Sequence, residues 1–133
     1  MLAREEIDRR VVATLAESLA VDASHVTPSA RLRDDLDAES IDFLDIVFRL
    51  EREFGIKIPR GELFPEAIFQ GDPEYVQDGR VTDAGLVELR KRMPFADLSE
   101  FEKDPVASRV ADLFTVDLIS RYVCAKLGTN SAD

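Results

Sequence analysis

Residues Asp34–Pro59, DDLDAESIDFLDIVFRLEREFGIKIP, decide both the fold and the candidate site. Ser40 follows a tight acidic loop and opens an amphipathic pattern that ends near Phe54, with Gly55 as the expected C-cap. Pro59 then prevents the helix from continuing. A serine in this position is a favoured N-cap. Its hydroxyl is exposed at the positive end of the helix dipole, where it can carry a phosphate-linked group.

The expected helix over residues 40–54 has two faces, at about 100° per residue. The core face holds Phe43, Val47, Leu50 and Phe54, flanked by Ile46, and the opposite face holds Asp42, Asp45, Arg49 and Arg52. Ile41 and Phe48 break this pattern, because they lie along one line on the charged side. Two aligned apolar residues beside Ser40 indicate a docking ridge within an acidic rim.

The flanking segments also predict helices. Residues Ile7, Val11, Leu15 and Leu19 recur every four residues and predict a helix from about Arg4, and Val116, Ile119, Val123 and Leu127 predict a last helix. Thr115 is its expected cap and Gly128 its expected end. Leu32 and Leu36 are expected to pin the long loop onto the core.

The segment 60–103 predicts an insertion. It comprises a short helical piece within 61–68, a hairpin around Asp78-Gly79, and a helix from Thr82 to about Met93 that Pro94 ends. Asp104-Pro105 then predicts the start of a further helix. The apolar face of that helix would comprise Val106, Val110, Leu113 and Phe114. We therefore expect an all-α chain that forms one domain over residues 1–133, a four-helix bundle with an inserted subdomain at 60–103 holding a small hairpin and an extra helix.

Composition excludes several classes of function. The 133 residues carry a net charge of −10, which argues against nucleic-acid binding and favours partners with basic patches. The sequence predicts a cytoplasmic protein, because the N-terminus lacks the apolar core of a secretory signal and no apolar run reaches the length of a membrane span. We also expect a monomer.

Catalytic and metal sites find little support. One cysteine, Cys124, and one histidine, His25, cannot supply a disulfide, a zinc cluster or a convincing nucleophile–base pair. The acidic run 35–39 lacks the glycine and glutamate that a calcium loop needs at its sixth and twelfth positions. We therefore predict that the protein has no metal site and that it is not itself an enzyme.

The run from Asp35 to Pro59 resembles the acyl carrier proteins. These have a first amphipathic helix, a long loop, an Asp-Ser-Leu motif opening the second helix, and an Ile-Pro exit after a Glu-Glu-Phe-like run. This chain has Glu39-Ser40-Ile41 and then EFGIKIP over 53–59, and residues 4–59 are similar to the family throughout. Residues 42–48, DFLDIVF, with the FGIKIP exit and the Asp-Gly hairpin, are similar to the specialised carriers for very long acyl chains of lipid A.

The resemblance implies a covalent 4′-phosphopantetheine on Ser40, installed from coenzyme A by a separate phosphopantetheinyl transferase. The thiol of that arm would hold acyl groups for fatty-acid or lipid biosynthesis. The partner-binding face implied by position comprises Glu39, Ile41, Asp42, Asp45, Phe48 and Glu51. Asp45 and Glu51 would meet Arg or Lys of a ketosynthase, acyl-activating enzyme or acyltransferase. If Ser40 is the N-cap, Ser40→Ala is expected to lower the free energy of unfolding by about 0.5–2 kcal/mol. The fold should survive this loss, while carrier function disappears.

The chain departs from the family pattern in three places. Glu39 stands where an aspartate usually precedes the serine, Ile41 replaces leucine, and Arg52 falls where carriers usually keep an acid. These departures bear on the partner more than on the modification. Two alternatives stay open: a carrier of aminoacyl or peptidyl groups, and a helical adaptor that binds its partner without being modified.

The insertion is rich in apolar residues, namely Leu63, Phe64, Ile68, Phe69, Leu86, Leu89, Met93 and Phe95. One hypothesis is that it enlarges or lids a cavity for a long acyl chain, since each buried methylene gains about 0.8 kcal/mol. The other is that it is a partner-specific docking arm. Protection of long-chain acyl forms after deletion of residues 62–102 would separate them.

Overall fold

The computed structural model describes residues 2–59, 61–93 and 96–128, apart from the side chains of Ser40 and Glu66. The chain divides into two compact units. The bundle unit spans Met1–Ile58 and Phe114–Asp133, and the inserted unit spans Pro59–Leu113. The expected all-α class is confirmed. That both units work as one domain with an insertion at 60–103 stays a prediction, and the inserted unit is broader than that range.

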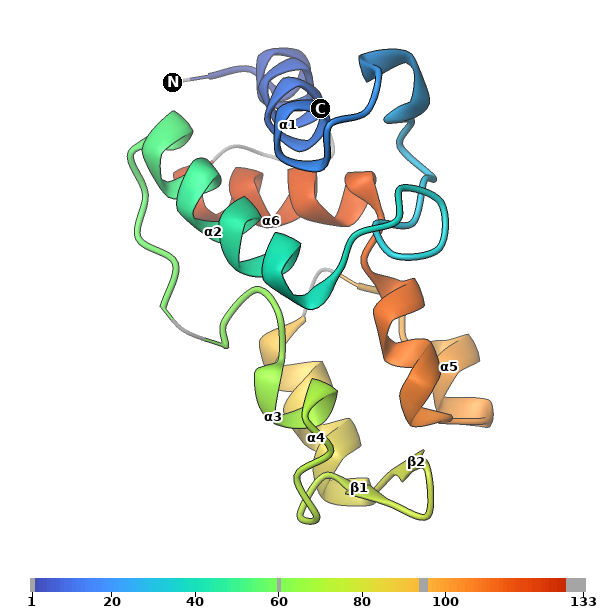
Figure 1. Cartoon of the computed structure of the whole chain (residues 1–133). Coiled ribbons are helices and arrows are strands. Elements are labelled where there is room, and N and C mark those ends of the chain that lie inside the picture. Colours follow the sequence, from blue (N-terminus) through green and yellow to red (C-terminus); the bar gives the residue numbers. More distant parts are fainter. Residues whose placement is uncertain (1, 60, 94–95, 129–133) are drawn as a thin grey trace. The chain divides into compact units, whose positions relative to one another are not determined.

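The bundle unit is built from α1 (Arg4–Leu19), a 3₁₀ turn η1 (Ala23–His25), α2 (Ser40–Phe54) and α6 (Val116–Leu127). Helix α1 packs against both α2 and α6 (Figure 1). The expected boundaries of these three α-helices are confirmed, as are Gly55 and Gly128 as left-handed C-caps. Thr115 caps α6 as predicted, because its hydroxyl accepts the Leu118 backbone N–H at 3.2 Å.

The apolar stripes predicted from periodicity form the core of the bundle unit. Ile7, Val11 and Leu15 of α1 are fully buried, as are Ile119 and Val123 of α6. The last member of each stripe, Leu19 in α1 and Leu127 in α6, is only half-buried. Helix α6 also buries residues outside its predicted stripe, among them Tyr122 and Cys124. It is therefore the most enclosed of the three helices.

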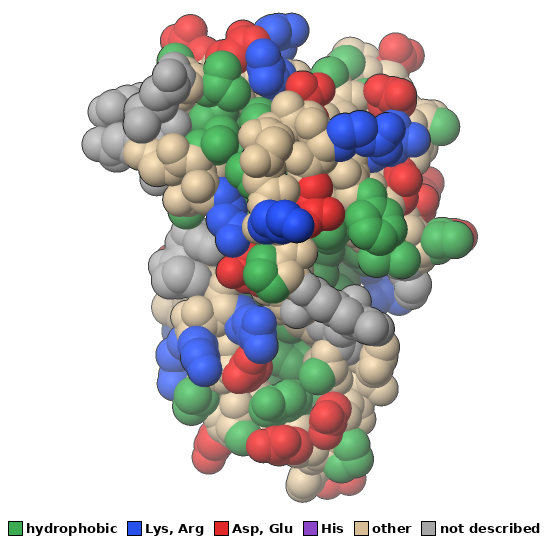
Figure 2. Space-filling view, turned by 90° about the vertical axis from the view of Figure 1, so that its left-hand side faces the viewer, with side chains coloured by type: hydrophobic (Ala, Val, Ile, Leu, Met, Phe, Trp, Pro, Cys, Tyr) green, Lys and Arg blue, Asp and Glu red, His purple; other side chains and the backbone are tan. Residues whose placement is uncertain are grey.

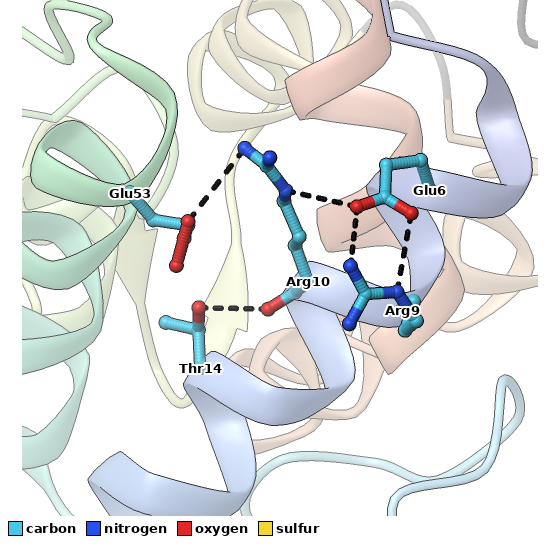
Figure 3. Close-up of polar contacts among 5 residues, drawn as sticks. All are labelled: Glu6, Arg9, Arg10, Thr14 and Glu53. Carbon is cyan, nitrogen blue, oxygen red and sulfur yellow. Dashed lines mark hydrogen bonds and ion pairs between the residues drawn. The ribbon is translucent and has the colours of Figure 1, made fainter.

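An ion pair between Arg10 and Glu53 joins α1 to α2 at the surface of the bundle unit (Figure 3). The Arg10 guanidinium lies between Glu6 of its own helix, 3.2 Å from Nε, and Glu53 of α2, 3.7 Å from Nη1. Arg9 also binds Glu6, and Thr14 donates to the Arg10 carbonyl at 2.8 Å. Half-exposed pairs of this kind contribute about 0–1 kcal/mol each, so apolar burial carries most of the stability.

The long loop before α2 is fixed to the chain that enters α6. The Leu32 backbone N–H donates to the Phe114 carbonyl at 2.9 Å, and the Leu32 carbonyl accepts the Ala38 N–H at 2.9 Å. The side chains of Leu32 and Leu36 are buried, as predicted. These contacts fix where the loop ends and α2 begins.

The inserted unit holds α3 (Glu66–Phe69), β1 (Val76–Gln77), β2 (Arg80–Val81), α4 (Asp83–Arg92), α5 (Ser99–Lys103) and a 3₁₀ helix η2 (Ala107–Leu113). The predicted hairpin is confirmed, since β1 and β2 pair antiparallel around Asp78 and Gly79. Both turn residues have positive φ, 54° and 74°, as a type I′ turn requires. Thr82 caps α4 by accepting the Gly85 N–H at 3.1 Å.

The helix start predicted at Asp104-Pro105 is wrong. The Val81 N–H donates to the Pro105 carbonyl at 2.8 Å, and the Ala107 N–H donates to the Gly79 carbonyl at 2.9 Å. This segment therefore runs beside β2, and only the 3₁₀ helix η2 follows. Helix α5 was not expected, because five residues are too few to show a period. Pro94, the expected end of α4, lies outside the described residues.

Most apolar residues of the insertion are buried. Leu63, Phe64, Ile68, Leu86, Leu89 and Met93 are 9% exposed or less. Phe69 is 38% exposed, and Phe95 lies outside the described residues. The burial shows that these side chains pack within the protein, and it does not choose between the two roles suggested for the insertion.

Gly85 in α4 is expected to resist substitution by alanine. A Cβ at Gly85 would lie 2.6 Å from the Tyr75 carbonyl oxygen and 2.5 Å from Val81 Cγ1. Gly85→Ala should therefore lower the free energy of unfolding by about 1–3 kcal/mol, although alanine is the better helix former. Urea denaturation measures the change. The control Val87→Ala alters an exposed position of the same helix and should cost less than about 0.5 kcal/mol; equal effects would contradict the close approach.

Candidate functional site

Ser40 is the first residue of α2, and both its neighbours in sequence are exposed. Glu39 before it has extended backbone, and Ile41 after it is 73% exposed. The side chain of Ser40 itself lies outside the described part of the structure. Its backbone stands at the start of a 15-residue helix, where the dipole and the first-turn N–H groups favour a phosphate.

The N-cap of α2 is Glu39, and the sequence-based assignment of the cap to Ser40 is wrong. The Asp42 carboxylate accepts the Glu39 backbone N–H at 2.7 Å, within a capping box. Glu39 and Asp42 stand three residues apart, the spacing that such a box requires. Ser40 is thus the first helical residue, and its expected contribution as a cap does not apply.

Three apolar side chains form an exposed ridge along α2. Ile41 and Phe48 are 73% and 55% exposed, which confirms that they project from the core. Leu44 is 51% exposed and belongs with them, a residue that the docking ridge expected from the sequence does not include. The spacing of three and then four residues places all three on one face and could have identified it. We call these residues the α2 ridge.

The core face of α2 is the one predicted. Ile46 and Leu50 are fully buried, while Phe43, Val47 and Phe54 are half-buried. The helix is therefore held through its middle, and the ridge lies on the side that the bundle unit leaves uncovered.

The acidic residues expected to bind partners contact this chain instead. Asp45 Oδ2 accepts a hydrogen bond from Ser18 Oγ of α1 at 2.6 Å and another from Arg49 Nε at 2.7 Å. Glu51 Oε2 accepts the Ile58 backbone N–H at 2.9 Å, which fixes the exit after α2. Both acids help to shape the bundle unit. Their part in partner binding stays a prediction.

The pKa of Asp45 is lowered by these neighbours. The hydrogen bond from Ser18 is the largest cause, followed by the hydrogen bond from Arg49. Because the folded protein favours the carboxylate, Asp45 stabilises the fold above the ordinary pKa of an aspartate, and this stabilisation is lost as pH falls through the lowered pKa.

Other reactive groups are few among the described residues. Burial raises the pKa of the Cys124 thiol, which makes it a poor nucleophile. The same part of the chain holds no cluster of three or more His, Cys, Asp or Glu side chains arranged to bind a metal. Nor does it contain a helix that is both long and apolar enough to span a membrane.

Comparison with known proteins matches residues 9–66 to a family described as the phosphopantetheine attachment site. An acyl carrier protein of Thermotoga maritima is 46% identical over 63 residues, which are 47% of this chain and 78% of that protein. One of Rubrobacter xylanophilus is 44% identical over 59 residues, 44% of this chain and 73% of that protein. The acyl carrier protein AcpXL of Rhizobium etli is 48% identical over 50 residues, 38% of this chain and about half (54%) of that protein.

Removing the Ser40 hydroxyl should leave stability nearly unchanged. Because Glu39 is the cap residue, Ser40→Ala should change the free energy of unfolding by less than about 0.5 kcal/mol. Asp42→Ala removes the partner of the Glu39 N–H and should cost about 1 kcal/mol. Urea denaturation of both variants measures the difference. A larger loss for Ser40→Ala than for Asp42→Ala would show that the serine is the cap after all.

Ser18→Ala should raise the pKa of Asp45, because it removes the largest cause of the lowered value. Carboxyl NMR titration measures this shift directly. The variant should be less stable than the wild type at neutral pH, and the difference should shrink as pH falls through the pKa of Asp45. Ser29→Ala, at an exposed loop position, is the control. An Asp45 titration that is the same in all three proteins would refute the role given to Ser18.

Proposed function

This chain belongs to the acyl carrier protein family, and from that premise we propose that Ser40 is the residue that carries its covalent 4′-phosphopantetheine. As a member of the family, the chain holds acyl groups for fatty-acid or lipid synthesis. When attached, the arm supplies the thiol on which an acyl group is held as a thioester. The protein's own residues supply the place of attachment and the surface that partner enzymes meet.

The position of Ser40 at the start of α2 is the observation that carries this proposal. Ser40 lies within the matched segment 9–66. Two other hydroxyl groups of that segment are engaged within the bundle unit: Thr14 is buried and donates to a backbone carbonyl, and Ser18 donates to Asp45. Ser40 opens a long helix between exposed neighbours, which suits a residue that must be reached by a modifying enzyme.

The residues around Ser40 fit a phosphodiester group. The first turn of α2 presents its positive dipole end there. Glu39 and Asp42 carry negative charge nearby, which would repel a free phosphate ion. A covalent ester needs no such attraction to stay in place, so the acidic neighbours do not oppose attachment.

Catalysis is assigned to the partners. The proposed partners are a phosphopantetheinyl transferase and a ketosynthase, acyl-activating enzyme or acyltransferase, all acting in the cytoplasm, where coenzyme A is available. The proposed docking surface comprises Glu39, Ile41, Asp42, Asp45, Phe48 and Glu51, to which the exposure of Leu44 adds a seventh residue. In the sequence, one histidine, His25, and one cysteine, Cys124, do not supply a convincing nucleophile–base pair for a reaction of its own.

Long or specialised acyl groups are the proposed cargo. The resemblance of residues 42–59 to carriers of very long chains supports this, together with the similarity to AcpXL over 50 residues. The inserted unit is a second compact body that the matched segment 9–66 barely reaches. Its role as an acyl shelter or as a docking arm stays a prediction.

Intact-protein mass spectrometry tests the proposal. After incubation with coenzyme A and a broad-specificity phosphopantetheinyl transferase, the wild type should gain the mass of one phosphopantetheine. Ser40→Ala, which should remain folded, should gain none, while Ser29→Ala should be modified like the wild type. Modification of Ser40→Ala would refute the assignment. The absence of modification with the organism's own transferase would favour an unmodified adaptor.

A further inference from the structure

Almost every charged side chain of α2 has a contact within the chain. Asp42 accepts the Glu39 N–H, Asp45 binds Ser18 and Arg49, and Glu51 accepts the Ile58 N–H. These contacts fix the carboxylates to the backbone or to neighbouring side chains. A partner that sought them would compete with bonds already formed.

Arg49 and Glu53 are engaged as well. Arg49 lies between Asp45 and Glu17 of α1, with its Nη1 3.2 Å from Glu17 Oε1. Glu53 pairs with Arg10 of α1 (Figure 3). The charges of Asp45 and Glu53 are thus largely balanced by arginines of the same unit, which weakens their attraction for a partner at close range.

Arg52 is the exception among the charged residues of α2. It is exposed, and it forms no hydrogen bond or ion pair with any described residue. Its charge acts on Asp45 only as a minor cause of that residue's lowered pKa. The helix dipole favours a basic residue in the last turn. That accounts for the charge of Arg52 and leaves all of its guanidinium N–H groups available.

Arg52 extends the α2 ridge. It follows Phe48 by four residues and Leu44 by eight, so the three side chains lie on one face of the helix. The ridge runs from beside Ser40 to Arg52, with apolar side chains first and a cation at its far end. Figure 2 shows Lys and Arg side chains among Asp and Glu on the face it draws, so the net charge of −10 does not make the whole surface acidic.

We propose that the acyl-condensing enzyme that accepts acyl groups from this carrier presents an apolar pocket to the α2 ridge and a carboxylate to Arg52. The proposal rests on the proposed function, since it names the surface of a partner in acyl transfer. Charge complementarity argues for it, because Arg52, which has no ion pair with a described residue, places a positive charge on the ridge face. A guanidinium binds a carboxylate with two parallel hydrogen bonds, which would also fix the register of the helix on the partner.

The test uses the full-length carrier, converted to its phosphopantetheine form, acylated, and confirmed by intact mass. The KM of the source organism's ketosynthase for each acyl carrier is then measured at low salt. Arg52→Glu should raise KM about tenfold or more, because it places like charges together. Arg52→Gln should raise KM less than Arg52→Glu. Arg52→Lys should raise KM least, because it keeps the positive charge but loses the two parallel hydrogen bonds. The effect should shrink as salt is added.

Arg33→Glu is the matched control, because Arg109 and the rest of the inserted unit belong to the suggested docking arm. It makes the same change in net charge at an exposed arginine of the bundle unit that has no ion pair with a described residue, and it should leave KM within about twofold. Thermal unfolding of every variant shows whether the helix end is intact. Arg52→Gln and Arg52→Lys carry the comparison where Arg52→Glu is destabilised, because neither introduces a negative charge near the helix C-terminus.

Two outcomes overturn the proposal. A KM that falls in Arg52→Glu means that the partner is basic at this point. A KM that matches the control Arg33→Glu, with or without a loss of stability, means that Arg52 serves only the helix. Either outcome is distinct from failure of the proposed function, which appears earlier in the same experiment as a carrier that gains no phosphopantetheine.

Discussion

The place where α2 begins depends on Leu32. Its side chain is fully buried, its N–H is bonded to the Phe114 carbonyl, and its own carbonyl holds the Ala38 N–H. A loop of this length would otherwise leave Ser40 free to adopt many positions at a considerable cost in entropy. Since the strand-like contact joins the loop to the start of α6, the bundle core and the candidate attachment site are fixed by the same few bonds.

A second constraint divides α2 along its length. Asp45 bonds the helix to α1, and Asp42 and Glu51 accept backbone N–H groups at its start and just after its end. The ridge residues Ile41, Leu44 and Phe48 are instead exposed to solvent. Exposing three large apolar side chains in a row is unfavourable in water. The arrangement is understandable where an enzyme covers them during each transfer, and it leaves the polar contacts of the helix undisturbed.

Local patterns could be predicted from the sequence, and contacts between distant segments could not. The caps Thr82 and Thr115 and the turn at Asp78-Gly79 depend on residues a few positions apart, so their chemistry is visible in the sequence. The pairing of residues 105–107 beside β2 depends on segments more than twenty residues apart, and it overrode a sound helix signal at Asp104-Pro105.

The candidate site shows the same division. The exposure of Ile41 and Phe48 follows from helical periodicity alone, whereas the role of Ser40 is implied by the resemblance to acyl carrier proteins and stays a prediction. The engagement of Asp45 by Ser18 does not, because it requires the packing of α1 against α2, which periodicity leaves open. The strong general preference of serine for N-cap positions predicts Ser40 as the cap, yet a glutamate and an aspartate three residues apart form the capping box instead.

Net charge and local charge have separate effects on recognition by a partner. A field from ten excess negative charges acts over a Debye length, about 8–10 Å at physiological salt, and speeds encounters with enzymes that are basic overall. Once the surfaces touch, unpaired groups contribute to the register, and among the described charged residues of α2 the proposal gives that part to Arg52. A partner suited both to the net negative charge of the carrier and to the local positive charge of Arg52 would be basic around its docking site and would have a carboxylate within it. A carrier with an acid in place of Arg52 would be repelled by that carboxylate at close range. One arginine would thus let the partner enzyme discriminate between two carriers that long-range attraction brings to it equally well.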